Sequence, residues 1–103
     1  MTLQKTSTLR ALYTGLRQAL EQPPPWLAVD LALGAPVVWV QAQGLGAALG
    51  VDPGWAILAL DREGIPAQGS RPLRVHPVTG ERLSRRVRWT AIAAGPLLEW
   101  LAA

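Results

Sequence analysis

The 103-residue sequence contains no cysteine, no phenylalanine and no asparagine, and its one histidine is His76. The absence of cysteine excludes disulfides, thiolate catalysis and cysteine-ligated zinc or iron–sulfur sites. A single imidazole also argues against a histidine-based metal site. We therefore expect no bound metal ion.

Charged residues are scarce as well, at 17% of the chain, whereas hydrophobic residues account for 50%. Such a chain is too apolar for intrinsic disorder and long enough to close one small core, which predicts a single globular domain over residues 1–103. The charged residues include nine arginines but one lysine. This bias and the missing asparagine are compatible with a thermophilic host, but a codon bias toward G and C accounts for them equally well.

Signals for export and membrane insertion are weak. The chain opens on an amphipathic pattern instead of the basic, apolar and small-residue regions of a secretory leader, so we expect a cytoplasmic protein. The uncharged run from Leu31 to Val51 is long enough to cross a bilayer, but glycine, proline and glutamine interrupt it. We therefore expect no membrane-spanning helix.

Residues 7–22 have the clearest regular pattern. Leucines and a tyrosine recur at spacings of three and four, with arginine, threonine and glutamate on the opposite side, which predicts an amphipathic helix. Thr6 or Ser7 can cap its first turn, and a run of three prolines ends it. Gly95-Pro96 predicts a second, short helix over Leu97 to Ala102.

The other regular segments are predicted to be strands. WLAVDLAL, residues 26–33, fits either a strand or a short helix, and we favour the strand. Further strands are predicted over Val37–Ala42, Trp55–Leu60, Ile65 onward, Leu73–Pro77 and Leu83–Ile92. Turns are expected at Gly34-Ala35-Pro36, at Asp61 to Gly64 and at Thr79-Gly80, and GLGAALG allows at most two helical turns before Asp52-Pro53-Gly54 breaks it.

These elements predict an α+β fold. It has a mostly antiparallel sheet of about five or six strands, with the N-terminal amphipathic helix packed on one face and a short C-terminal helix. The five tryptophans lie at or within predicted elements, so most should belong to the core. Each indole N–H then requires a hydrogen-bond acceptor.

Two short motifs are similar to known patterns. ILALDREGIPAQGS, residues 57–70, resembles the strand–turn–strand hairpin of the roadblock and longin families of small regulatory domains, but the preceding elements depart from the roadblock order and no function follows. GLGAALG, followed by Asp61, is similar to the dinucleotide-binding glycine pattern. Its glycine spacing differs, and Pro53 cuts the required helix short, so no nucleotide or other cofactor is expected.

Positive charge is concentrated near the C-terminal end. Residues 71–90 hold six of the nine arginines and His76, against one carboxylate, Glu81. Four basic and five acidic residues precede position 71, whereas six basic and two acidic residues follow from it onward. A segment with such an excess of basic over acidic residues is either a site for an anion or the solvated face of a hairpin.

The predicted hairpin determines which arginines meet. On a two-residue loop at Thr79-Gly80, Arg74 lies opposite Arg85 and Leu73 opposite Arg86, and a one-residue shift exchanges these partners. Strand alternation then turns three residues inward, Val87, Trp89 and Ala91, and three outward, Arg86, Arg88 and Thr90.

Like charges that face one another across two strands repel unless an acid or a bound anion lies between them. The planar guanidinium donates two hydrogen bonds at once and suits phosphate. The candidate anion-binding residues are therefore Arg74, Arg85, Arg86, Arg88 and His76. In the alternative interpretation, Glu81, Glu99, another carboxylate or water neutralises the arginines.

Three functions are compatible with the sequence. We favour a non-enzymatic interaction module that binds a protein partner and is homodimeric, because an edge hairpin invites self-association. The alternative is a polyanion or nucleic-acid binder that uses the hairpin 71–90. The second alternative, a small enzyme, requires Asp30, His76 and an arginine to converge in one cleft, and nothing in their spacing forces this.

Overall fold

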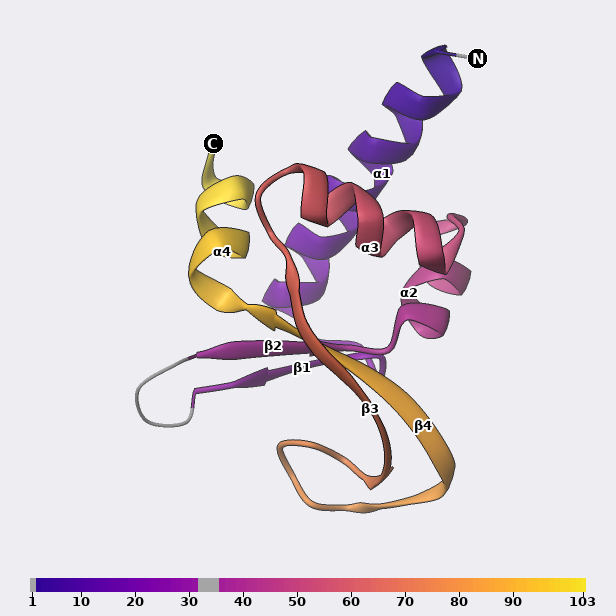
Figure 1. The fold of residues 1–103 in the computed structure, drawn as a ribbon, viewed down its shortest axis with the longest axis vertical. Helices are drawn as coiled ribbons and strands as arrows, with labels where there is room; N and C mark the ends of the chain where they lie inside the picture. Colours follow the sequence, from indigo (N-terminus) through magenta and orange to yellow (C-terminus); the bar gives the residue numbers. More distant parts are fainter. Residues whose placement is uncertain (1, 32–35) are drawn as a thin grey trace.

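The computed structural model describes the backbone of residues 2–31 and 36–103, with side chains from residue 9 onward in these ranges. The elements within them are α1 (Thr2–Glu21), β1 (Leu27–Asp30), β2 (Val37–Val40), α2 (Ala42–Leu49), α3 (Pro53–Arg62), β3 (Ala67–Val75), β4 (Arg82–Ala93) and α4 (Ala94–Ala102) (Figure 1). The strands form one antiparallel sheet in the order β1-β2-β4-β3. The α+β class and the antiparallel sheet are confirmed, but the described part has four strands instead of five or six.

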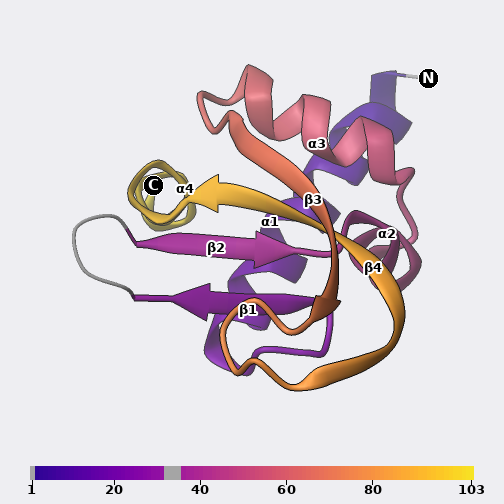
Figure 2. The same cartoon turned by 60° about the horizontal axis from the view of Figure 1, so that its bottom comes forward.

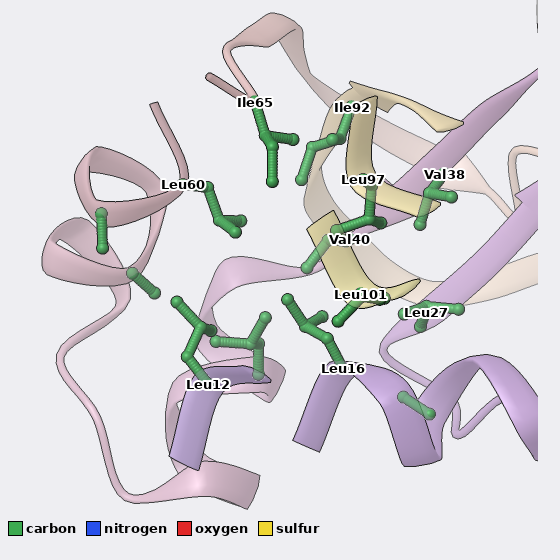
Figure 3. Packing of buried hydrophobic residues seen from close by; sticks show 14 of the residues in the cluster. Leu12, Leu16, Leu27, Val38, Val40, Leu60, Ile65, Ile92, Leu97 and Leu101 are labelled. Carbon is green, nitrogen blue, oxygen red and sulfur yellow. The ribbon is translucent and has the colours of Figure 1, made fainter. Parts of the chain in front are cut away.

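All four helices lie on one side of the sheet (Figure 1). The predicted apolar stripe of the first helix is confirmed, because Leu12 and Leu16 of α1 are fully buried. They pack in one cluster with Val38 and Val40 of β2 and with Leu97 of α4 (Figure 3). Burying a leucine side chain in this way stabilises the fold by about 1.5–3 kcal/mol.

The strand predicted over Trp55–Leu60 is wrong, because this segment lies in α3. Asp52-Pro53 begins a helix here instead of merely breaking one: Asp52 accepts a hydrogen bond from the N–H of Trp55 at 2.8 Å, and proline suits the first helical position. The buried residues Ala56 and Leu60 are one helical turn apart. The resemblance of residues 57–70 to a roadblock hairpin is lost with the strand.

The first hairpin is confirmed. Leu27 of β1 pairs with Val40 of β2, and Asp30 pairs with Val37, so WLAVDLAL begins as a strand. The predicted turn at Gly34-Ala35 lies outside the described residues. The predicted cap at Thr6 or Ser7 is wrong, because α1 already begins at Thr2 and both residues lie within the helix.

The second hairpin is confirmed as well, but its predicted register is wrong. Leu73 pairs with Val87 instead of Arg86, and Arg74 lies at a bulge instead of opposite Arg85. The connecting loop is not two residues long but covers residues 76–81, between the end of β3 and the start of β4. The N–H of His76 bonds across it to the carbonyl of Glu81 at 2.8 Å.

The tip of this hairpin curls back beneath the sheet, on the side away from the helices (Figures 1 and 2). Trp89 and Ala91 are buried, as predicted, and Val87 is half-buried, but Thr90, which was expected to be exposed, is 6% exposed. The side chain of Thr90 points to the same side of β4 as that of Ile92, which belongs to the main core. β4 is therefore largely exposed near Arg82 and has both faces covered from Trp89 to Ile92.

Only some of the indole N–H groups make the hydrogen bonds that were expected for buried tryptophans. The indole N–H of Trp100 donates to Glu63 Oε1 at 3.0 Å. Within the described residues, the buried Nε1 atoms of Trp39 and Trp89 have no such partner. Over the same part of the chain, no helix has both the length and the apolar composition of a membrane span.

Candidate functional site

The arginine-rich half of β4 has one edge that no other strand of the described residues covers. β4 is paired with β2 only from Thr90 to Ala93, because β2 ends at Val40 and the chain then turns into α2. On its other side, β4 pairs with β3 at Arg82, Val87 and Arg88, and residues 83–86 form a bulge between these pairs. We call the uncovered side of residues 82–88 the open β4 edge.

Backbone groups along the open β4 edge make no other backbone hydrogen bonds within the described part of the chain. The chain turns away from this edge at Gln41, whose N–H donates instead to the carbonyl of Trp26 at 2.8 Å. The end of β2 therefore determines where the edge of β4 becomes free (Figure 2).

A hollow of about 200 Å³ lies beside this edge. It forms where the start of α2 approaches β4, and we call it the arginine hollow. Its lining comprises Gln41, Gln43, Arg85, Arg86, Val87 and Arg88.

The charges around the arginine hollow are of one sign. None of the three arginines makes an ion pair with a carboxylate of the described residues, and the one hydrogen bond from their side chains joins Arg88 Nη1 to Ser70 Oγ at 3.3 Å. The first turn of α2 adds no acidic residue, and its free N–H groups carry partial positive charge. The site is therefore an unneutralised basic cluster.

The structure brings together three of the five predicted site residues: Arg85, Arg86 and Arg88 line one hollow. Arg74 is exposed on β3 and does not belong to this lining. His76 lies in the hairpin loop, where its Nδ1 accepts the N–H groups of Val78 and Thr79.

Two residues of the lining were not predicted. Gln41 and Gln43 follow β2 and are more than forty positions before the arginines in the chain, so no local pattern connects them. The side chain of Gln41 is held by a hydrogen bond from its Nε2 to the carbonyl of Pro25 at 3.3 Å. Each glutamine supplies neutral donors and acceptors beside the guanidinium groups.

The pairing register does not bring together Asp30 and His76, the pair that an enzyme would use. Asp30 lies opposite Val37, which lies opposite Ala93, four residues along β4 from Trp89. At about 3.3 Å per residue, Asp30 is roughly 13 Å along the strand direction from Trp89, and two strands away. His76 packs against Trp89 itself.

A second hollow, of about 410 Å³, lies between α1 and α4. Its walls include Tyr13 and Trp100, whose rings meet edge to face at 5.3 Å. The Tyr13 hydroxyl donates to the carbonyl of Leu101, and the Trp100 indole donates to Glu63. These two polar groups are satisfied within the fold. The described lining has one charged residue, Arg10, against three arginines in the arginine hollow.

Comparison with known proteins finds no matching family model, no similar curated protein and no similar solved structure. Across the described residues, no group of three or more histidine, aspartate or glutamate side chains is arranged to hold a metal ion.

Proposed function

We propose that this chain is a non-enzymatic binding module for an anionic partner, and that Arg85, Arg86 and Arg88 receive it. One observation carries the proposal: three arginines of a single strand line a hollow, and none of the other described residues that line it is a carboxylate. Proteins usually relieve such repulsion with acids, and an anion bound between the guanidinium groups would relieve it here.

The chemistry of the lining favours an oxyanion. Arginine recognises carboxylate and phosphate through paired N–H donors, and it loses its hydration more easily than lysine does. The partial positive charge at the start of α2 acts in the same direction. The neutral amide of Gln43 can donate a further hydrogen bond without adding charge.

A salt titration tests the proposal. We expect the full chain to bind single-stranded DNA, duplex DNA or poly-glutamate at low salt. If three phosphates are neutralised, the slope of log K against log salt is about −2 for single strands and about −2.7 for duplex DNA. Arg86→Ala and Arg88→Ala should weaken binding, whereas Arg17→Ala, which removes an exposed arginine of α1, should not. No binding of any of these polymers at low salt would overturn the proposal.

The expectations of a homodimer and of a cytoplasmic location stay predictions. The outer edge of β3 opposes self-association through that strand, because it carries Pro72, a bulge between Ala67 and Gly69, and exposed arginines. Sedimentation equilibrium over a range of protein concentrations tests the dimer directly.

A further inference from the structure

We infer that the anionic partner is a single-stranded nucleic acid, whose phosphates lie in the arginine hollow and one of whose bases stacks on the indole of Trp26. This inference rests on the proposed function and specifies its partner. It adds a site for the base beside the site already described for the anion.

A third hollow, of about 340 Å³, lies between α1 and α2, and Trp26 forms part of its wall. We call it the tryptophan hollow. None of the described residues that line it is charged, and two of them, Gln18 and Gln22, carry exposed side-chain amides. An aromatic ring next to neutral donors and acceptors suits a nucleobase, which has a planar face and a hydrogen-bonding edge.

Trp26 also connects the tryptophan hollow to the arginine hollow. Its carbonyl accepts the N–H of Gln41 at 2.8 Å, and the side chain of Gln41, which lines the arginine hollow, bonds to the carbonyl of Pro25. This contact exists because β1 begins beside the end of β2, where Leu27 pairs with Val40 (Figure 2). The two hollows therefore lie on either side of the start of α2.

Close packing against α2 fixes the position of Trp26. A Cβ atom at Gly44 would lie 2.5 Å from Cβ and 3.1 Å from Cγ of Trp26, so glycine is needed for this approach. The tryptophan is nevertheless only half-buried, and it contributes to the wall of the hollow. A ring held in one orientation loses little conformational entropy when a base stacks on it.

Three other tryptophans are less suited to stacking beside the arginines. Trp89 follows the arginines of β4 directly but is fully buried, and the indole nitrogen of Trp39 is buried as well. Trp100 lies at the hollow between α1 and α4, where its N–H already donates to Glu63. Of these four tryptophans, Trp26 combines a place in the wall of a hollow with a direct contact to the lining of the arginine hollow.

The surface of α2 beside the two hollows is uncharged. Gln43, Ala47 and Ala48 are exposed there, so no carboxylate of these residues repels a phosphate chain. An acidic protein segment would also satisfy the arginines, but a nucleic acid has both an anion and a planar base in every nucleotide, which matches a basic hollow beside an aromatic one. A duplex keeps its bases stacked inside, so the expected partner is a single strand.

Three ligands test the inference with the full chain. The first is an oligothymidine of about eight nucleotides, the second is an abasic oligomer with the same number of phosphates, and the third is a hairpin duplex of DNA. Affinities are measured by fluorescence anisotropy at low salt. Oligothymidine should bind at least fivefold more tightly than the abasic oligomer, because stacking a base on an aromatic side chain contributes a factor of about this size or more.

Substitutions should separate the base from the phosphates. Trp26→Ala should weaken the binding of oligothymidine at least fivefold and leave the binding of the abasic oligomer and of the duplex unchanged. Trp26→Phe, which keeps an aromatic face, should retain most of the affinity. Arg86→Ala and Arg88→Ala should weaken the binding of all three ligands, whereas Arg17→Ala, outside the described lining of both hollows, should not.

Indole fluorescence keeps the inference testable if Trp26→Ala fails to fold. Oligothymidine should quench part of the emission of the wild-type chain, and the abasic oligomer should not. Trp26→Phe should abolish this quenching. The matched variant Trp100→Phe, which removes an indole from the hollow between α1 and α4, should preserve it.

The possible failures separate the two proposals. Equal affinities for oligothymidine and the abasic oligomer, or quenching that survives in Trp26→Phe, would overturn the base site while an arginine-dependent affinity sustained the proposed function. Arginine-dependent binding of poly-glutamate without binding of oligothymidine would overturn the partner class alone. Absence of binding to the oligomers, to the duplex and to poly-glutamate would overturn both.

Discussion

The imidazole of His76 meets the indole of Trp89 edge to face, with ring centroids 5.3 Å apart and ring planes inclined by 72°. Nδ1 of the same imidazole accepts the N–H groups of Val78 at 3.2 Å and Thr79 at 3.1 Å. One side chain thus organises the hairpin loop and covers a fully buried tryptophan. We therefore expect the curl of the hairpin beneath the sheet to depend on His76.

Two substitutions of His76 distinguish the stabilising contribution of its Nδ1 acceptor from that of its ring. The Oδ1 atom of asparagine lies as many bonds from the backbone as Nδ1 and can accept the same two N–H groups. His76→Ala loses both hydrogen bonds and should lower the free energy of unfolding by about 1–3 kcal/mol, at about 1 kcal/mol for each bond plus the lost ring contact. In urea unfolding, His76→Asn should be clearly less destabilised. Equal losses in the two variants would show that the acceptor contributes nothing.

Asp52 should contribute to stability as the cap of α3. Its Oδ2 accepts the N–H of Trp55 at 2.8 Å. Asp52→Ala should cost about 0.5–2 kcal/mol, and Asp52→Asn, which keeps an oxygen at the same position, should cost less. Thermal unfolding followed by circular dichroism measures both. An alanine variant as stable as the wild type would contradict this account of how α3 begins.

Gly46 should resist substitution because α2 packs closely against the start of α3. A Cβ atom at this position would lie 2.7 Å from the carbonyl oxygen of Val51 and 2.8 Å from Cγ of Pro53. Gly46→Ala should therefore lower the free energy of unfolding by about 1–3 kcal/mol. Gly95→Ala in α4 is the matched control, because a Cβ there meets nothing within 4 Å. It should be neutral or stabilising by up to about 1 kcal/mol.

The arginine hollow should show opposite effects of substitution on binding and on stability. Arg86 has like-charged neighbours in Arg85 and Arg88 and no ion pair within the described residues. Arg86→Ala should leave the free energy of unfolding unchanged or raise it by about 0.2–1 kcal/mol, because it relieves repulsion. The same variant should weaken anion binding. A clear loss of stability in chemical unfolding would indicate a structural role for this guanidinium group.

Local pattern predicted those elements whose signal is contained within a few turns or a single hairpin. The leucine stripe of α1 and the β-branched residues of β2 predicted their structures directly. A strand was predicted in place of α3 because Asp52-Pro53-Gly54 can either break a helix or begin one. Which of the two occurs depends on whether the apolar face of the following helix packs against a core. The hairpin register was predicted wrongly because a bulge and a six-residue loop take the place of a tight turn.

The sequence by itself determined an α+β domain with an excess of arginine in one hairpin, because periodicity and charge are properties of neighbouring residues. The tertiary structure alone decided which arginines share a hollow, since this depends on where β2 leaves the side of β4. It also decided that Gln41 and Gln43 join them from a distant part of the chain. Pairing across a sheet brings distant residues together, and no local pattern in a single sequence encodes where one strand stops covering another.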